Sequence, residues 1–328
     1  MDIPLSSLSA NFQHAILATA ELGFSYLWID SLCIIQGNRE DWQREARRMG
    51  DVYRHSTCNL SAAYADPTRG FLFEDQSRDV NLPSVHNPKN GRTYILSEKT
   101  PWLHIWNAPL FERAWVFQEQ ILAPRALHFG QDQMFWECKA RFANEVWPTG
   151  WSDEPRKPFG WAWGYSRSRA GYQPFWQFSV QRPRTSKEKQ SLFMTWYLIV
   201  TNYSHRKLTF ASDRVPAIEG IASEFSECFP DDQYLFGLWK LDLHRGLLWA
   251  APKSAETPRD RPHWDKVPSW SWASIDVPVG FEGDRLFQDG KSLSHIEYDH
   301  ECEQGPSLRI KRKTTEIQRD QARSFGLS

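Results

Sequence analysis

Three residues that could carry chemistry, Asp30, Cys33 and Gln36, lie in the largely apolar run Tyr26–Gln36, which reads YLWIDSLCIIQ. Asp30 is its only charged residue, and a carboxylate in apolar surroundings is costly unless it is paired, hydrogen-bonded or protonated. Asp30 is therefore either a structural group that caps a helix or pairs with an arginine, or a carboxylate of a functional site. Cys33 is either a small apolar residue of the core or a nucleophile. Gln36 ends the run.

A second group of polar residues lies in PLFERAWVFQEQIL, Pro109–Leu122. A proline in the opening turn and apolar residues at helical spacing predict a helix here. Arg113 and Glu119 are six positions apart and do not share a helix face, so we expect them to have different partners. Gln118 and Glu119 adjoin the apolar stripe, so we expect one of the two side chains to point into the core. The alternative is that Glu119 is a charged residue on the helix surface.

The sequence lacks the spacings of the common catalytic and nucleotide-binding motifs. It contains no GxGxxG, GxxxxGK[ST], HExxH or GxSxG, which argues against the commonest dehydrogenases, P-loop enzymes, zinc proteases and serine hydrolases. The five cysteines are far apart, without a CxxC or a histidine pair at zinc spacing. We therefore expect reduced thiols and no bound metal.

These residues need a scaffold, and the pattern of the first 140 residues predicts an α/β domain with a mostly parallel sheet flanked by helices. The run Tyr26–Gln36 is almost continuously apolar, as in a parallel strand covered on both faces, and open α/β sheets bind ligands at the carboxyl ends of such strands. We expect a helix before it, over 10–22, and one after it that ends near Arg54. A strand over 57–65 would complete a β-α-β unit.

The rest of the chain divides by composition. We further expect strands over 92–97 and 268–281, a hairpin over 126–138, and helices over 187–202 and 216–228. The predicted divisions are the α/β domain over 1–140, a tryptophan-rich irregular excursion over 141–186, an α+β region over 187–300 and a basic, flexible tail over 301–328.

Composition restricts the function classes. The 328 residues are 41% hydrophobic and 24% charged, which is typical of a globular protein. Lys and Arg number 39 against 40 Asp and Glu, so no global field favours nucleic acid or an anionic membrane. No apolar run is long enough to span a bilayer, and the N-terminus lacks the pattern of a signal peptide. We therefore expect a cytoplasmic protein. Its 17 tryptophans indicate either bulky core residues or an aromatic-lined groove.

Several blocks, in this order, resemble the fungal HET (heterokaryon incompatibility) domain. They are YLWIDSLCIIQ, DWQREARRMGDVYRHSTCNLSAAYA, RAWVFQEQILAPRALHFG and FWEC. The resemblance continues in YSHRKLTFASDRVPAIEGIA, YLFGLW and VPSWSWAS, and covers roughly residues 10 to 280. HET domains normally begin with a strand-forming block that ends in Trp-Gly, which this sequence lacks. The family's motif positions correspond here to Asp30, Cys33, Gln36, Met49, Tyr53, Arg113, Trp115, Gln118 and Glu119.

The resemblance implies a role in non-self recognition and regulated cell death when unlike fungal cells fuse. HET domains also resemble TIR domains distantly, and several TIR domains cleave NAD at the nicotinamide bond with a glutamate. If this chain is such an enzyme, with NAD as substrate and no cofactor, Glu119 would be the general base or the stabiliser of an oxocarbenium ion. Asp30 and Cys33 would be the other catalytic residues, and Arg113 would bind the substrate. Substrate contacts would come from Trp115, Gln36, Tyr53 and Gln118.

Two other hypotheses stay open. In the first, the chain is a non-catalytic death-signalling module that associates with itself or with another such protein. In the second, it is an enzyme of fungal specialised metabolism. The latter would hold a small molecule in an aromatic pocket formed by the tryptophan-rich excursion.

Overall fold

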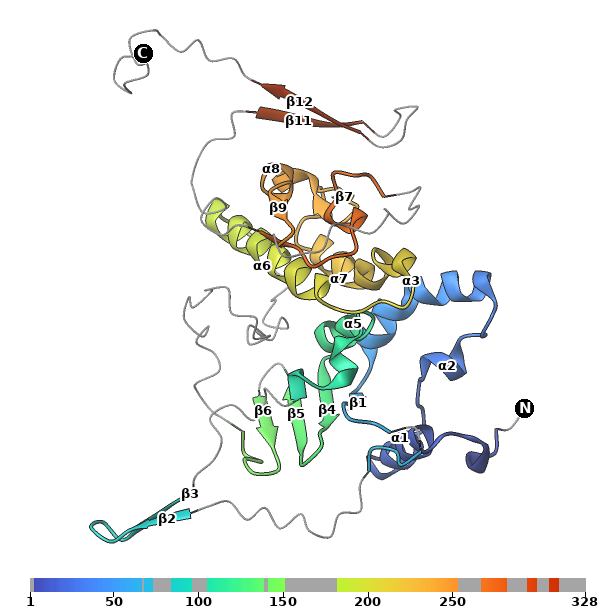
Figure 1. The fold of residues 1–328 in the computed structure, drawn as a ribbon, viewed down its shortest axis with the longest axis vertical. Helices are drawn as coiled ribbons and strands as arrows, with labels where there is room; N and C mark the ends of the chain where they lie inside the picture. Colours follow the sequence, from blue (N-terminus) through green and yellow to red (C-terminus); the bar gives the residue numbers. More distant parts are fainter. Residues whose placement is uncertain are drawn as a thin grey trace. The chain divides into compact units, whose positions relative to one another are not determined.

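The computed structural model of the chain describes residues 3–66, 68–72, 84–95, 105–138, 141–150, 182–252, 267–281, 294–299 and 307–312 (Figure 1). The chain forms two compact units. The first contains Met1–Arg182 and His205–Cys228, and the second contains Pro183–Ser204 and Phe229–Ser328. Most of the predicted tryptophan-rich excursion and of the predicted tail lies outside the described residues. None of the described helices has both the length and the apolarity needed to cross a membrane.

The first unit contains a four-stranded mixed sheet in the order β1-β4-β5-β6. Strand β1 pairs in parallel with β4, whereas β4 with β5 and β5 with β6 are antiparallel. The expected mostly parallel sheet is therefore not found in this unit, because β4, β5 and β6 pair with one another as antiparallel neighbours. The strands are β1 (Asn59–Ala62), β4 (Arg125–Phe129), β5 (Met134–Cys138) and β6 (Arg141–Asn144), with a separate hairpin of β2 (Ser84–Asn87) and β3 (Arg92–Ile95).

Helices pack around this sheet. After the 3-10 turn η1 (Leu5–Ser7), α1 (Ala10–Glu21) packs through Ala18 against Phe71 and Phe129. Helices α3 (Arg39–His55), α5 (Val116–Leu122) and α7 (Pro216–Ser226) pack against one another, and Figure 1 shows them together beside one end of the strands. The 3-10 turn η4 (Ala211–Asp213) precedes α7. The predicted helices over 10–22, up to Arg54 and over 216–228 are confirmed.

The run Tyr26–Gln36 is not a strand, and this prediction was wrong. Residues 26–29 have no regular secondary structure, and Tyr26 is 94% exposed. The short helix α2 (Asp30–Cys33) follows, and its N-terminus is favoured because the Asp30 carboxylate accepts the Ser31 N–H at 2.6 Å. The apolar composition typical of a buried strand is therefore compatible with a turn, and the β-α-β unit expected from it does not form.

The helix predicted over Pro109–Leu122 is broken into two parts. A 3-10 turn, η2 (Pro109–Glu112), is separated from α5 by Arg113, whose backbone is extended. The Ala114 N–H donates to the Lys207 carbonyl at 2.9 Å, and the Lys207 N–H donates to the Glu112 carbonyl at 2.6 Å. These bonds to a distant segment replace intrahelical ones, which explains the break.

The second unit is built around α6 (Ser186–Ser204), which confirms the helix expected over 187–202. The indole N–H groups of Trp196 and Trp272 both donate to the Gly237 carbonyl at 3.0 Å. The strand predicted over 268–281 was wrong except at its end: Ser271 caps η6 (Trp272–Ser274), and only β10 (Gly280–Phe281) is a strand. The other elements are β7 (Tyr234–Leu235), β8 (Leu238–Trp239), η5 (Lys240–Asp242), α8 (Leu243–Gly246), β9 (Trp249–Ala250), β11 (Ser294–Asp299) and β12 (Ser307–Arg312).

Candidate functional site

Four of the residues singled out from the sequence meet in the first unit, around Glu119 of α5. Tyr53 is buried in the last turns of α3, where burial and then the negative charge of Glu119 raise the pKa of its phenol. Asp30 at the start of α2 and Arg113 at the break before α5 both interact electrostatically with this pair. The cluster thus combines two carboxyl groups, a phenol and a guanidinium group, which come from four segments of the unit.

The surroundings of Glu119 shift the pKa of its carboxyl group to near neutral pH. Burial, followed by the negative charge of Asp30, raises the pKa of Glu119 to about 7, and the Tyr53 hydrogen bond and the charges of Arg113 and Arg206 act in the opposite direction. Burial also raises the pKa of Tyr53, so its phenol stays protonated. A carboxyl group that exchanges its proton near pH 7 is suited to general acid or base catalysis.

Two residues near this cluster were not singled out from the sequence. The Trp28 ring packs edge-on against Tyr53, with ring centroids 5.8 Å apart. Arg206 places its guanidinium group 4.3 Å from the centre of the Phe117 ring. Trp28 could have been noticed in the apolar run, whereas Arg206 is far from Glu119 in the sequence and only the tertiary fold brings it close.

Gln118 and Trp115 lie apart from the Glu119 carboxyl group, in the packing of α5. Gln118 is 1% exposed, and its side-chain amide donates to the Pro216 carbonyl at 3.5 Å. The indole N–H of Trp115 donates to Asp213 at 3.1 Å, and its ring is edge-on to Trp42. The structure therefore places both at the junction of α5 with its neighbours, and substrate contact by either stays a prediction. Met49 is buried in α3.

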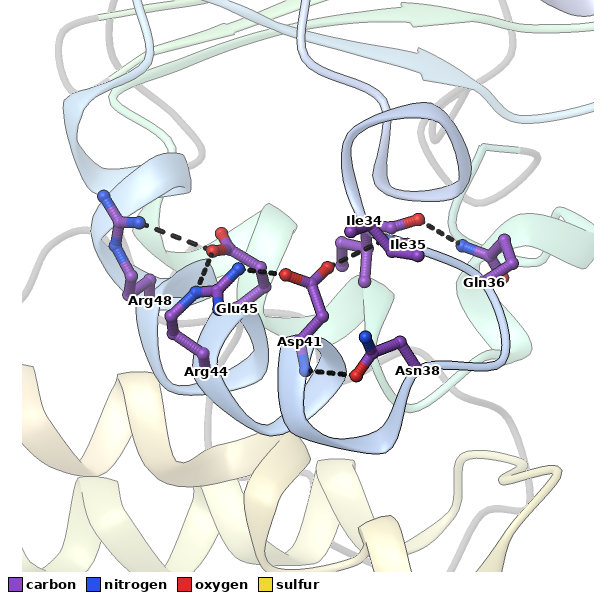
Figure 2. Close-up of polar contacts among 8 residues, drawn as sticks. All are labelled: Ile34, Ile35, Gln36, Asn38, Asp41, Arg44, Glu45 and Arg48. Carbon is purple, nitrogen blue, oxygen red and sulfur yellow. Dashed lines mark hydrogen bonds and ion pairs between the residues drawn. The ribbon is translucent and has the colours of Figure 1, made fainter.

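Gln36 and Cys33 belong to the connection between α2 and α3, which has its own polar network (Figure 2). The Gln36 amide donates to the Ile34 carbonyl at 2.9 Å. Asp41 accepts the Ile35 N–H at 2.8 Å, so the connection is tied to the first turn of α3. Cys33 is exposed. In the described part of the chain neither Gln36 nor Cys33 forms a hydrogen bond with Glu119, and their roles stay predictions.

A set of three histidine, cysteine or acidic side chains arranged to hold a metal ion does not occur in the described part of the chain. Arg113 is exposed beside the cluster, and its guanidinium group could bind an anionic ligand.

Comparison with known proteins gives one match. Residues 1–119 match the family model described as heterokaryon incompatibility protein (HET). No curated protein and no solved structure matches the chain. The matched region contains Asp30, Tyr53 and Arg113 and ends at Glu119, so Arg206 lies outside it.

Proposed function

We propose that the heterokaryon incompatibility (HET) domain of residues 1–119 is a hydrolase that cleaves the bond between nicotinamide and ribose in NAD or a related nucleotide. The observation that carries this proposal is the Glu119 carboxyl group, whose pKa is raised to about 7 in a cluster with Tyr53, Asp30 and Arg113. A carboxylate in such a site can stabilise a positively charged sugar and accept a proton from water.

The reaction needs few protein groups. The C–N bond to the pyridinium ring breaks, nicotinamide leaves as a neutral molecule with the bonding electron pair, and an oxocarbenium ion remains on the ribose. Ionised Glu119, aided by Asp30, stabilises this cation electrostatically. Water then attacks, and Glu119 accepts the proton that is released. Arg113 is exposed at the cluster and supplies a positive charge for the diphosphate.

This activity would give the protein a role in regulated cell death after fusion of unlike fungal cells. Depletion of a nucleotide shared by the whole cytoplasm would be the lethal step. This biological role follows from the family resemblance and the proposed activity together.

The test is to incubate the purified full chain with NAD and to measure free nicotinamide by chromatography. We expect the rate to rise through pH 7 as Glu119 becomes ionised, and Glu119→Gln to lose at least about 100-fold in rate. Glu112→Gln is the matched control, because Glu112 pairs with Lys207 instead. The proposal is wrong if the wild type releases no nicotinamide or if Glu119→Gln is as active as the wild type.

A second candidate function, self-association without catalysis, is supported by a different observation. Many of the large hydrophobic side chains that are exposed in the described residues lie between Ile3 and Ile35, among them Tyr26 at 94% and Ile35 at 61%. Residues 1–38 contain no Lys or Arg, so this surface offers no positive charge for an anionic partner, and its exposed apolar side chains suit an apolar protein surface instead. A second copy of the chain would provide one.

Sedimentation at increasing protein concentration tests this second function. We expect wild type and Glu119→Gln to dimerise equally, and the double variant Tyr26→Ser, Ile35→Ser to stay monomeric. Phe210→Ser is the control, because Phe210 is 66% exposed but lies elsewhere in the sequence. A wild type that stays monomeric at every concentration would rule out this function.

A further inference from the structure

Trp28 precedes Asp30 by two positions, in the connection that leads into α2. Ile29 between them has an extended backbone, with φ −131° and ψ 124°. In an extended backbone, side chains two positions apart point to the same side of the chain. The Trp28 ring and the Asp30 carboxylate therefore leave the connection on the same side.

The Trp28 ring is held by Tyr53 of α3. The two ring centroids are 5.8 Å apart and the angle between the ring planes is 83°, which is the edge-to-face arrangement that aromatic pairs prefer. Tyr53 is 7% exposed, whereas Trp28 is only partly buried. A perpendicular ring covers at most one face of an indole, so this contact restrains Trp28 and leaves its second face uncovered by Tyr53.

The charge around this ring is negative. Asp30 is exposed beside Trp28, and residues 1–38 contain no Lys or Arg. Burial, and then the negative charges of Glu119 and Asp30, raise the pKa of Tyr53, so both carboxyl groups lie near the residue that holds the indole. The face of an indole attracts cations through its quadrupole. A cationic ring on Trp28 is therefore attracted by the indole and by the Asp30 carboxylate.

Trp115, the tryptophan that the family resemblance suggests for substrate contact, has different partners. Its indole N–H donates to Asp213 at 3.1 Å, and its ring is edge-on to Trp42. These contacts belong to the junction of α5 with its neighbours. Trp28 is the tryptophan that is joined directly to Asp30 and Tyr53 of the cluster.

We infer that Trp28 binds the pyridinium ring of NAD and thereby selects the oxidised dinucleotide over the reduced one. The inference rests on the proposed function, which makes NAD the substrate. The pyridinium ring of NAD is cationic, whereas the dihydropyridine ring of NADH is neutral, and a cation–π contact strengthens binding by roughly 2- to 30-fold. The positive charge passes to the ribose as the C–N bond breaks, so Trp28 contributes to substrate binding and not to the rate of cleavage.

Equilibrium binding of NAD and NADH tests this selectivity without turnover. Each is titrated by calorimetry into the full chain carrying Glu119→Gln, with and without Trp28→Leu. We expect Trp28→Leu to raise the dissociation constant of NAD roughly tenfold and that of NADH by less than about threefold. Trp147→Leu is the matched control and should change neither constant, because Trp147 is 39% exposed but follows β6. Equal losses for NAD and NADH would overturn the inference.

Fluorine NMR makes the test independent of the stability of Trp28→Leu. The full chain carrying Glu119→Gln is labelled with 5-fluorotryptophan, and the signal that is missing in Trp28→Phe is assigned to Trp28. NAD should shift this signal, whereas ADP-ribose, which has the adenine and the diphosphate but no nicotinamide, should leave it in place. An equal shift with ADP-ribose would place the adenine on Trp28. A shift of the Trp115 signal alone would place the pyridinium there, and either result overturns the inference.

Steady-state kinetics gives a third readout. Trp28→Leu should raise the KM for NAD roughly tenfold and keep kcat within about twofold of the wild-type value, because the lost interaction belongs to substrate binding. A fall in kcat with an unchanged KM would contradict this role.

The outcomes distinguish the inference from the proposed function. If nicotinamide is released but NAD does not shift the Trp28 signal, the inference is wrong and the proposed function stands. If NAD shifts the signal but no protein releases nicotinamide, Trp28 binds the ring and the proposed reaction is wrong. If neither dinucleotide binds, both are wrong.

Discussion

Each unit of this protein contains a buried tyrosine paired with a carboxyl group, and the two pairs differ in their surroundings. In the second unit the Tyr197 hydroxyl donates to Asp242 at 2.5 Å, and Arg245 donates to the other carboxylate oxygen at 2.8 Å. Asp242 is 3% exposed, and Phe281 stacks on Tyr197. In the first unit the partners of Tyr53 and Glu119 include Asp30 and Arg113, which are both exposed.

This difference indicates which pair is structural. Both oxygens of Asp242 are used by side chains of its own unit, and burial raises the pKa of Tyr197, which keeps its phenol a donor. Around Glu119, the Asp30 carboxylate and the Arg113 guanidinium group belong to exposed residues instead, so a ligand could bind them. A buried tyrosine and carboxylate pair is therefore not by itself a sign of chemistry, and accessible charges beside it are the distinguishing feature.

The largest effect is expected from Asp242→Ala. It leaves Arg245 and the Tyr197 hydroxyl without their acceptor, so the free energy of unfolding should fall by about 3 kcal/mol. Chemical denaturation followed by tryptophan fluorescence measures it, with the exposed Asp231→Ala as control. Nicotinamide release, measured well below the melting temperature, should be unchanged. A large specific loss of activity in Asp242→Ala would show that the second unit takes part in the reaction.

Glu119→Gln should have the opposite effect on stability. Folding raises the pKa of Glu119 from 4.5 to about 7, so the folded state binds this proton more tightly than the unfolded state. The associated stability is present below pH 4.5 and is lost as the pH rises through 7. Removing the ionisable group should therefore stabilise the protein at pH 8 by at most about 3 kcal/mol, and by nearly nothing at pH 4.

Denaturation curves of wild type and Glu119→Gln at both pH values measure this difference. Glu45→Gln serves as control, because Glu45 makes ion pairs with Arg44 and Arg48 on the surface of α3. A Glu119→Gln variant that is less stable than the wild type at pH 8 would mean that the ionised carboxylate is well satisfied, as Asp242 is.

Local patterns predicted the helices better than they predicted the site. The apolar stripes of α1, α3, α6 and α7 are local, and the order of blocks was sufficient to find the resemblance to the HET family, whose model matches residues 1–119. The apolar run at Tyr26 was misleading, because composition does not show whether a strand has a partner to pair with. Arg113 could not be placed either, since the break before α5 depends on backbone bonds to Lys207.

The proximity of Asp30, Tyr53 and Glu119 was implied only by the family resemblance, not by spacing. Three separate segments meet there, and one of the groups that sets the charge, Arg206, lies in a fourth. Long-range electrostatics of this kind has no local sequence signal.

Gly220→Ala should have an intermediate effect, and it tests how the first unit holds α5. The new methyl group would overlap the Gln118 amide oxygen and lie 2.9 Å from the Gly50 Cα atom. The helices α3, α5 and α7 must then separate, which should lower the free energy of unfolding by about 2 kcal/mol. Gly280→Ala is the control in the second unit, because nothing lies within 4 Å of the added atom. Equal melting temperatures for the two variants would refute the tight junction.

The smallest effects are expected from Tyr53→Phe and Tyr197→Phe, which remove one hydroxyl group from each pair. Each should lower the free energy of unfolding by about 1 kcal/mol. For Tyr53→Phe the loss should be greater at pH 8 than at pH 5, because the hydroxyl group stabilises the ionised form of Glu119 and a hydrogen bond to a charge is stronger. Its nicotinamide release should also need a higher pH, whereas Tyr197→Phe should keep the wild-type pH profile. If both variants shift the profile equally, the two pairs are not functionally distinct, and accessible charge does not identify the site.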